Sequence, residues 1–311
     1  MQQTRRLDAL ILGGGVAGLT AALTLKGFGF ETLVVEEARS PGGQLHEIYA
    51  PITDHPFAFG SDGARYASIV LESARRAELS ILVGSPVTRV SVRTHTLARG
   101  RERFHARILL IATGLKRRWL GIPGERELLG RGVSLSANRD RTVYAGKQVV
   151  VIGGGTGAVE DALLCAEVGC QVTLLHRSAR FRARTDFLER ARKDPGIRIV
   201  TGAVVRRILG KDGVEGVEYR TKGSRVARTL GAEGVFVRIG WEPRTELVRG
   251  QVGLDRAGYV RVRPGGLTAV RGVFAAGDVC SPRCPTIANA AGQGAAAAWE
   301  IARHLKRVPA G

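Results

Sequence analysis

Apolar residues recur along the chain in runs that predict buried parallel strands, each followed by a glycine-rich turn and a helix. The run "ALIL" at Ala9 leads into "GGGVAG", an Ala/Leu-rich segment and a second apolar run, "ETLVVEE". The same order returns from Val149 as "VVVI", "GGGTGA" and "QVTLLHR". Each series is typical of a βαβ unit of about 30 residues. The pattern therefore predicts an α/β fold with two Rossmann-like, three-layer domains.

Composition narrows the class of protein. With 311 residues, 44% of them hydrophobic, the chain can bury the cores of two domains. No run of about 18 uncharged apolar residues predicts a membrane span. The basic start followed by apolar residues imitates a signal peptide, but Asp8 interrupts the apolar run and the glycines after it have the function described below. We therefore expect a cytoplasmic protein with no membrane association.

The formal net charge of +19 raises the question of nucleic acid binding. The basic residues are spread along the chain, however, and no helix-turn-helix, zinc-finger or aromatic RNA-binding motif lies among them. The charge instead predicts a preference for anionic ligands or for an acidic partner protein. A solvated arginine-rich surface would explain the same composition.

Both glycine-rich turns have the spacing that binds the pyrophosphate of a dinucleotide. The first glycine permits a tight turn, the second lets the phosphates approach the backbone, and the third allows close packing of helix on strand. The phosphates then lie at a helix N-terminus, where free amides and the helix dipole favour negative charge. The three positions are Gly13, Gly15 and Gly18 in the first copy and Gly153, Gly155 and Ala158 in the second.

The two copies differ at the end of their second strand. In the first copy this residue is Glu36, whose carboxylate can accept hydrogen bonds from both ribose hydroxyls of an adenosine and would repel a 2′-phosphate. In the second it is His176, which begins the basic stretch "HRSARFRAR" with Arg177, Arg180 and Arg182. Arginine suits phosphate through its planar set of donors and its permanent charge. The first unit is therefore predicted to bind a dinucleotide without a 2′-phosphate, and the second to bind NADPH in preference to NADH. A solvated basic strand end is the alternative for the arginines.

Four further motifs point to a family: "PGGQL" at 41–45, "ILLIATG" at 108–114, "GVFAAGDV" at 272–279 and the closing "AAGQGAAAA". Together, and over essentially the whole chain, they resemble those of the low-molecular-weight thioredoxin reductases. The resemblance implies that the first dinucleotide is FAD. It also implies an interrupted architecture, with an FAD-binding domain at 1–116 that resumes at 247–311 and an NADPH-binding domain, 117–246, inserted between the two parts.

Several site residues follow from the resemblance. Asp278 is expected to bond the ribityl chain of FAD, while Thr286 and Ile287 present backbone amides to the pyrimidine side of the flavin. Gln44 and Asp54 are expected to approach the isoalloxazine ring of FAD from its other edge. For Asp54 the match is less close, because "TDHP" stands where the family usually has Asn-aromatic-Pro, with one extra residue before it. The other predicted contacts are Gly43, Thr113, Gly114 and Gly277 to FAD, and Thr156, Gly157, Arg177 and Arg182 to NADPH.

The main departure from the family lies just before the second glycine loop. Thioredoxin reductases have Cys-x-x-Cys followed by Asp there, whereas this chain has Ser136 and Arg139 at the two cysteine positions and retains Asp140. Neither side chain can form a disulfide, so the internal dithiol is missing. Asp140 occupies the family's proton-donor position, and both a catalytic role and a structural one, holding the turn, remain open.

Four cysteines remain, and none forms Cys-x-x-Cys. Cys165 and Cys170 fall in an apolar helix and at the start of a strand, where they are expected to be small buried hydrophobes. Cys280 and Cys284 follow Asp278 and precede the flavin-facing amides, so they are the candidates for a substitute redox pair. Two cysteines with no nearby histidine do not predict a metal site.

These features favour an FAD-dependent NADPH oxidoreductase that passes electrons from FAD to an external acceptor, such as ferredoxin, flavodoxin, a quinone or another small acceptor. Ferredoxin-NADP reductases of this architecture also lack the dithiol and have acidic partners that would suit a basic surface. They usually extend beyond the last helix, however, whereas this chain ends at "HLKRVPAG". The alternatives are a disulfide reductase that uses Cys280 and Cys284, and a flavin-bound redox sensor or interaction module without turnover.

Two local predictions concern the remaining segments. "ILGKDGVEGVEYR" is typical of a hairpin that turns at Asp212 and Gly213. The Ala-rich segment from Thr286 onwards predicts a helix, whose flank is a candidate homodimer interface. Core burial would explain its alanines equally well.

Overall fold

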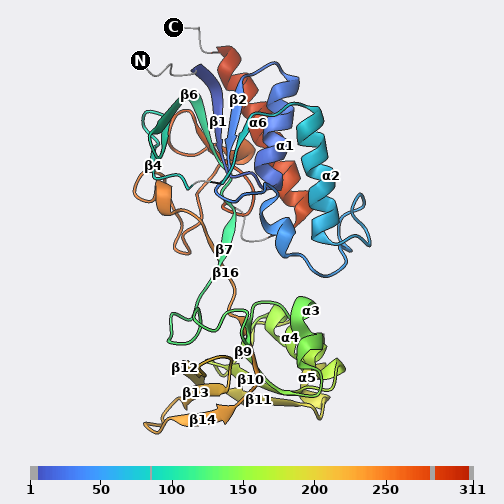
Figure 1. The fold of residues 1–311 in the computed structure, drawn as a ribbon. Coiled ribbons are helices and arrows are strands. Elements are labelled where there is room, and N and C mark those ends of the chain that lie inside the picture. Colours follow the sequence, from blue (N-terminus) through green and yellow to red (C-terminus); the bar gives the residue numbers. More distant parts are fainter. Residues whose placement is uncertain (1–5, 85, 281–283, 308–311) are drawn as a thin grey trace. The chain divides into compact units, whose positions relative to one another are not determined.

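The chain divides into two compact units, one inserted in the other. The computed structural model describes residues 6–84, 86–280 and 284–307. Unit 1 comprises Met1–Lys116 and Glu242–Gly311, and unit 2 comprises Arg117–Trp241 (Figure 1). The return to unit 1 comes at 241/242, whereas 246/247 was expected, and Glu242 and Glu246 both pair with Lys116 of unit 1. Where the chain crosses, strand β7 (Leu115–Arg117) pairs with β16 (Trp241–Pro243).

Unit 1 is built on a seven-stranded sheet in the order β3-β2-β1-β6-β5-β4, with β17 also paired to β6. Strand β1 is parallel to β2 and β6, and β5 is antiparallel to both β4 and β6. The continuous apolar runs of the sequence form the central strands, because these are covered on both faces. The strands are β1 (Arg6–Leu12), β2 (Thr32–Val35), β3 (Ile81–Leu82), β4 (Arg89–Ser91), β5 (Thr96–Arg99), β6 (Glu102–Ile111) and β17 (Val273–Ala275).

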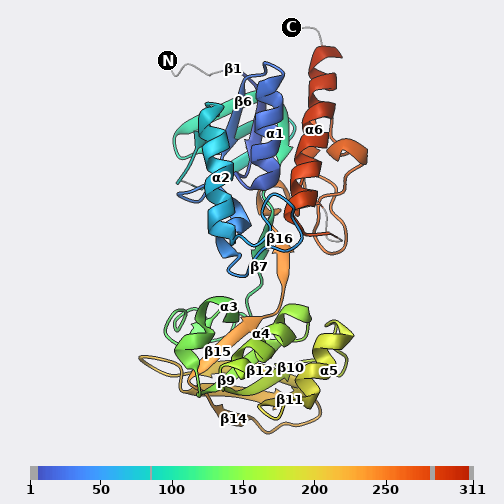
Figure 2. The same ribbon diagram turned by 90° about the vertical axis from the view of Figure 1, so that its right-hand side faces the viewer.

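Three helices of unit 1 are α1 (Val16–Gly27), α2 (Gly63–Arg76) and α6 (Ile287–Arg307). Helices α1 and α6 run side by side and cover one face of the sheet (Figures 1 and 2). Ala9 and Ile11 of β1 face these helices, whereas Leu10 and Leu12 face a second cluster that includes Val248. The predicted C-terminal helix is therefore confirmed, and its alanines are largely explained by packing on α1.

Unit 2 has three layers. A five-stranded parallel sheet, in the order β11-β10-β9-β15-β8, lies between helices and a three-stranded antiparallel sheet, β12-β13-β14. Val149 and Val151 of β9 pack towards α4, and Val150 and Ile152 pack towards the antiparallel sheet. The elements are β8 (Val133–Ser134), α3 (Ala137–Asp140), β9 (Gln148–Gly153), α4 (Thr156–Glu167), β10 (Gln171–His176), α5 (Thr185–Lys193), β11 (Ile197–Thr201), β12 (Ala203–Leu209), β13 (Gly216–Thr221), β14 (Arg228–Gly231) and β15 (Gly234–Arg238).

The two predicted βαβ units are present as β1-α1-β2 and β9-α4-β10, so the predicted fold class is confirmed. The predicted hairpin is also present, because β12 and β13 pair from Ala203↔Thr221 to Leu209↔Gly216. Cys165 and Cys170 are 0% and 1% exposed, as expected for small core residues. Within the described parts of the chain, no helix combines the length and the apolar character needed to cross a membrane.

The contact between α1 and α6 leads to a stability prediction. A Cβ atom at Gly294 of α6 would lie 2.3 Å from the carbonyl oxygen of Ala17, so Gly294→Ala forces the helices apart. We expect it to lower the free energy of unfolding by about 1–3 kcal/mol, as overpacking does. The matched control is Gly292→Ala in the same helix, where a Cβ meets nothing within 4 Å. Alanine there should stabilise the protein by about 0.5–1 kcal/mol. Urea unfolding of both variants measures the difference, and equal stabilities would contradict this description of the interface.

Candidate functional site

The first glycine loop joins β1 to α1 and leaves no room for side chains at two of its glycines. Gly13 has φ +105°, and a Cβ there would lie 2.3 Å from the carbonyl oxygen of Ala112. A Cβ at Gly18 would lie 2.0 Å from the carbonyl oxygen of Gly13. The loop therefore lies tightly against the end of β6 and delivers the chain to the N-terminus of α1, where an anionic phosphate is favoured.

Glu36 is held against this loop. One of its carboxylate oxygens, Oε2, accepts a hydrogen bond from the Gly14 amide at 2.7 Å, and Oε1 accepts one from the Ala38 amide at 2.8 Å. Gly43 lies on the other side of the loop, because a Cβ there would come within 3.1 Å of the Cα of Gly15. The structure thus brings together the glycines, Glu36 and Gly43 that the sequence analysis assigned to one dinucleotide.

Asp278 and Gln44 meet although they are far apart in the sequence. Gln44 Nε2 donates to Asp278 Oδ2 at 3.0 Å. The other carboxylate oxygen, Asp278 Oδ1, is buried and has no hydrogen-bond partner among the described residues. Burial raises the pKa of Asp278, and the hydrogen bond from Gln44 opposes this rise. A buried acceptor without a donor fits a ligand hydroxyl such as those of the ribityl chain of FAD.

The other residues predicted to contact FAD make separate hydrogen bonds and contacts within unit 1. Thr113 Oγ1 donates to the Arg244 carbonyl at 2.6 Å, and Gly114 lies near Gln44, whose Nε2 would be 3.8 Å from a Cβ at Gly114. Thr286 Oγ1 accepts from the amide of Asn289, in the first turn of α6. The Gly277 amide donates to Gln293 Oε1 at 2.9 Å.

The remaining two residues predicted beside the flavin, Ile287 and Asp54, differ in their surroundings. Ile287 is buried and packs with Leu45 and Ile52 in a small apolar cluster. Asp54 lies on an exposed turn, and within the described residues no hydrogen bond joins it to Gln44 or Asp278. Its assignment to the flavin remains a prediction, and the extra residue before "TDHP" is the feature that weakens it.

The second glycine loop joins β9 to α4 and has the same close packing. Gly153 has φ +157°, and a Cβ there would lie 2.3 Å from the carbonyl oxygen of Arg238. The imidazole of His176 lies against Gly154, where a Cβ would be 2.0 Å from its Cε1 atom. The Arg182 amide donates to the Gly154 carbonyl at 2.8 Å, so the basic stretch after β10 returns to the loop.

The arginines of this stretch differ in their surroundings. Arg184 is held by Asp186 at 2.7 Å and lies 4.8 Å from the ring centroid of Phe187. Arg177 and Arg182 are both exposed. Of the other predicted residues, Thr156 accepts a hydrogen bond from the Arg184 amide, Ala158 is buried, and Gly155 and Gly157 are in the loop and the first turn of α4.

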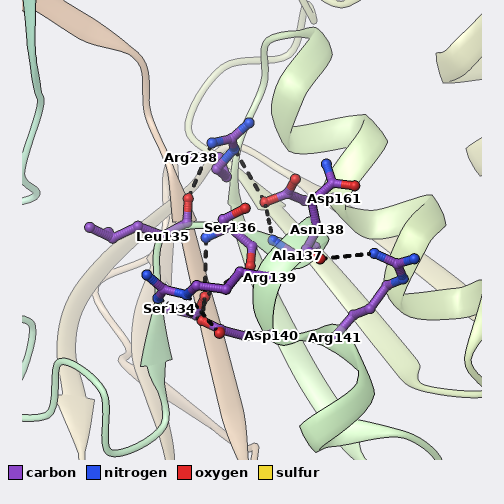
Figure 3. A network of polar contacts seen from close by, with 10 residues as sticks. All are labelled: Ser134, Leu135, Ser136, Ala137, Asn138, Arg139, Asp140, Arg141, Asp161 and Arg238. Atoms are coloured by element: carbon purple, nitrogen blue, oxygen red, sulfur yellow. Dashed lines mark hydrogen bonds and ion pairs between the residues drawn. The ribbon is translucent and has the colours of Figure 1, made fainter. Parts of the chain in front are cut away.

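The segment at the family's cysteine positions is fixed by polar contacts (Figure 3). Ser134 Oγ donates to Asp140 Oδ2 at 2.6 Å and accepts from the Ser136 amide. Arg139 donates to both Asp140 oxygens at 2.8 Å. Burial raises the pKa of Asp140, but the hydrogen bonds from Arg139 and Ser134 outweigh it, so the pKa is lowered overall. An ionised, paired carboxylate is a poor proton donor, and these contacts favour the structural role for Asp140.

A buried ion pair in unit 2 was missed by the sequence analysis. Asp161 of α4 is 1% exposed, and its Oδ2 lies 3.2 Å from Arg238 Nε and accepts from the Ala137 amide at 3.1 Å (Figure 3). Burial raises the pKa of Asp161 to about 6, against the lowering effects of Arg238 and of the amide. The available signals were an acid within the apolar run "AVEDALL" and an arginine that ends the strand "GVFVR".

The environment of Cys280 does not favour disulfide chemistry. Its thiol donates to the Gly277 carbonyl and to Gln293, and burial, together with Asp278, raises its pKa to about 12. Cys284 is exposed, and residues 281–283 between the two cysteines lie outside the described part of the chain. Cys280 is therefore a protonated thiol at neutral pH and a weak nucleophile.

The fold and these loops define a protein that binds two dinucleotides in separate α/β units. The chain matches the pyridine nucleotide-disulphide oxidoreductase family over residues 7–294, and it belongs to that family. It is 36% identical over 301 residues to thioredoxin reductase of Mycolicibacterium smegmatis, with 96% of each chain covered. It is 31% identical to a 34.2 kDa protein in the rubredoxin operon of Clostridium pasteurianum, covering 98% of this chain and 99% of that protein.

A solved structure agrees with this relationship. The crystal structure of thioredoxin reductase from Lactococcus lactis has a TM-score of 0.83 and 30% identity, with 97% of this chain and 100% of that chain covered. The expected resemblance to thioredoxin reductases is confirmed. Thioredoxin reductases use FAD and NADPH, which agrees with the cofactors predicted from the sequence.

Alkylation tests the state of Cys280. At pH 8 we expect iodoacetamide to modify exposed Cys284 quickly and Cys280 slowly, because a thiol with a pKa of about 12 is almost entirely protonated there. Trypsin cuts after Arg283 and so places the two cysteines in different peptides, which mass spectrometry quantifies separately. Cys284→Ser is the control for the assignment. Modification of Cys280 as fast as that of Cys284 would revive the disulfide hypothesis.

Proposed function

We propose that the protein is an FAD-dependent NADPH oxidoreductase that passes electrons directly to a separate acceptor. The observation that carries the proposal is the presence of Ser136 and Arg139 at the two cysteine positions, in a chain that retains both glycine loops. A serine hydroxyl and an arginine guanidinium cannot be oxidised and reduced reversibly as a dithiol can, so neither Ser136 nor Arg139 can relay electrons. The acceptor must therefore take electrons without an intervening dithiol.

In the proposed function, unit 1 holds FAD. Gly13, Gly15 and Gly18 accommodate the pyrophosphate, Glu36 binds the adenosine ribose, and Asp278 binds the ribityl chain. Held by these residues, FAD would supply the capacity to take a hydride from NADPH and to pass the electrons to an oxidised acceptor. The hydrogen bond from Gln44 fixes one oxygen of Asp278 and leaves the buried second oxygen for a ligand hydroxyl, so the chain contributes a preformed position.

The net charge supports an acidic redox protein as the acceptor class. A charge of +19 attracts acidic partners at long range and accelerates their encounter, as it would for ferredoxin or flavodoxin. Quinones and other small acceptors do not need that attraction. Ionic strength therefore separates the two classes, because screening slows turnover with an acidic protein much more than turnover with a neutral quinone.

An acceptor screen tests the function. We expect NADPH to bleach the flavin absorbance of the purified protein under anaerobic conditions, with no thiolate-to-flavin charge-transfer band. Ferredoxin, flavodoxin, quinones, dioxygen, low-molecular-weight disulfides and oxidised thioredoxin are then compared as acceptors. The double variant Ser136→Cys, Arg139→Cys is the matched comparison, because it restores Cys-x-x-Cys before Asp140. Brisk reduction of thioredoxin by the unmodified protein would overturn the proposal.

Nucleotide preference tests the assignment of unit 2. We expect Arg177→Ala with Arg182→Ala to lower kcat/KM for NADPH by about 100-fold or more, since each of the two lost hydrogen bonds to a charged group contributes about 1.5–3 kcal/mol. The value for NADH should change little, because NADH has no 2′-phosphate. Arg184→Ala is the control, since Asp186 and Phe187 already hold that side chain. Equal kcat/KM values for the two nucleotides in the unmodified protein would contradict the assignment.

A further inference from the structure

Arg238 lies beside the second glycine loop because its strand pairs with the strand that leads into the loop. No sequence motif places it there. It is the last residue of β15, and in the parallel register of β15 and β9 it stands directly beside Gly153, the first glycine of the loop. Ligands of open α/β sheets bind at the carboxyl ends of parallel strands. Arg238 is therefore a cation at the edge where the dinucleotide is expected, although it belongs to neither the loop nor the basic stretch after β10.

The guanidinium group is held on two sides. Its Nε atom lies 3.2 Å from Asp161 Oδ2, and Nη1 donates to the Leu135 carbonyl at 3.1 Å (Figure 3). The third nitrogen, Nη2, lies over the first turn of α4, because a Cβ at Gly157 would be only 2.8 Å from it. Within the described residues Nη2 has no hydrogen-bond acceptor. Two nitrogens therefore fix the plane of the group, and the third is left for a ligand.

Asp161 explains why the guanidinium keeps this orientation. Its carboxylate is buried and fixed by the Ala137 amide, so it cannot turn towards solvent. A buried carboxylate without a counter-charge is strongly unfavourable, and Arg238 is the cation that approaches it. The Arg238 side chain nevertheless keeps 21% of its surface exposed, so it is not sealed in the interior as Asp161 is.

We propose that Arg238 binds the pyrophosphate of the pyridine nucleotide and that Asp161 is the residue that positions it. The inference rests on the proposed function, because it takes the second glycine loop as the NADPH site. A guanidinium donates charge-assisted hydrogen bonds to phosphate oxygens. The pyrophosphate is common to NADPH and NADH, so Arg238 contributes to the affinity for both. Discrimination between them is left to Arg177 and Arg182.

The same contacts would also serve a purely structural purpose, since Arg238 and Asp161 tie residues 135–137 to α4. The two roles differ in their ligand dependence. Loss of a phosphate-binding arginine lowers the affinity for ligands that carry the pyrophosphate and leaves the affinity for other ligands unchanged. Loss of an arginine that only stabilises unit 2 lowers the unfolding temperature and the affinity for all ligands of the unit alike.

The experiment measures the Kd of the full-length, flavin-loaded protein for NADP⁺, NAD⁺ and 2′-AMP by isothermal titration calorimetry. 2′-AMP carries the 2′-phosphate but no pyrophosphate. For Arg238→Ala we expect the Kd for NADP⁺ and for NAD⁺ to rise by the same factor, about tenfold or more. The Kd for 2′-AMP should stay unchanged, and with NADPH as substrate the KM should rise more than kcat falls.

Three further variants sharpen the result. Arg238→Lys should restore part of the affinity for both dinucleotides, because it keeps the charge. Asp161→Asn should weaken dinucleotide binding less than Arg238→Ala does, since it loosens the guanidinium without removing it. Arg228→Ala removes an exposed arginine from β14, the edge strand of the separate antiparallel sheet, and should change no Kd.

Specific outcomes would overturn the inference. Unchanged affinity for NADP⁺ in Arg238→Ala would do so directly. An equal loss of affinity for NADP⁺ and 2′-AMP, accompanied by a lower unfolding temperature and no rescue by lysine, would assign Arg238 a structural role only. If the unmodified, folded protein bound neither NADP⁺ nor NAD⁺, the proposed function itself would fail, which is distinguishable from a failure of Arg238 alone.

Discussion

The close approach of each glycine loop to the neighbouring strand is the constraint on which both dinucleotide sites depend. In unit 1 a Cβ at Gly13 would lie 2.3 Å from the carbonyl oxygen of Ala112, and in unit 2 a Cβ at Gly153 would lie 2.3 Å from that of Arg238. No side chain fits in either place. The same packing therefore fixes the loop, the start of the following helix and the residue at the neighbouring strand end. Ala112 and Arg238 occupy equivalent positions in the two units. The residue beside the glycine loop therefore has a methyl group in unit 1 and a cationic side chain in unit 2.

The two units use this shared frame for opposite electrostatics. In unit 1 the carboxylate of Glu36 accepts hydrogen bonds from the amides of Gly14 and Ala38 and so holds a negative charge beside the loop. In unit 2 an imidazole lies against Gly154, and the Arg182 amide bonds to the carbonyl of that glycine. The predicted difference in nucleotide preference therefore depends on a few side chains at the strand ends rather than on the backbone.

The sequence predicts the features that depend on local pattern and misses those that depend on register. The βαβ units, the hairpin from β12 to β13 and helix α6 each follow from residues close together along the chain. Arg238 and Asp161 lie far apart, and their contact requires the order β9-β15 and the orientation of α4, which no local pattern specifies. The contact between Gln44 and Asp278 has the same origin, and only the family resemblance placed those two residues at one site.

The buried pair of Asp161 and Arg238 is better explained by positioning than by stability. Burial raises the pKa of Asp161 to about 6, so ionisation of this group is harder in the folded protein than in the unfolded chain. The contribution of Asp161 to the free energy of unfolding is therefore greatest when the carboxyl group is protonated. This contribution falls as the pH rises through 6. One of its oxygens, Oδ1, also lacks a partner among the described residues, and such a group costs about 1–3 kcal/mol. A buried ion pair is weak evidence for stability in general. At neutral pH the ionised Asp161 carboxylate therefore opposes folding. It nevertheless fixes the Arg238 guanidinium and the amide of residue 137, which belongs to the segment where the family has its dithiol. The proposed binding of a pyrophosphate by the guanidinium would offset this cost.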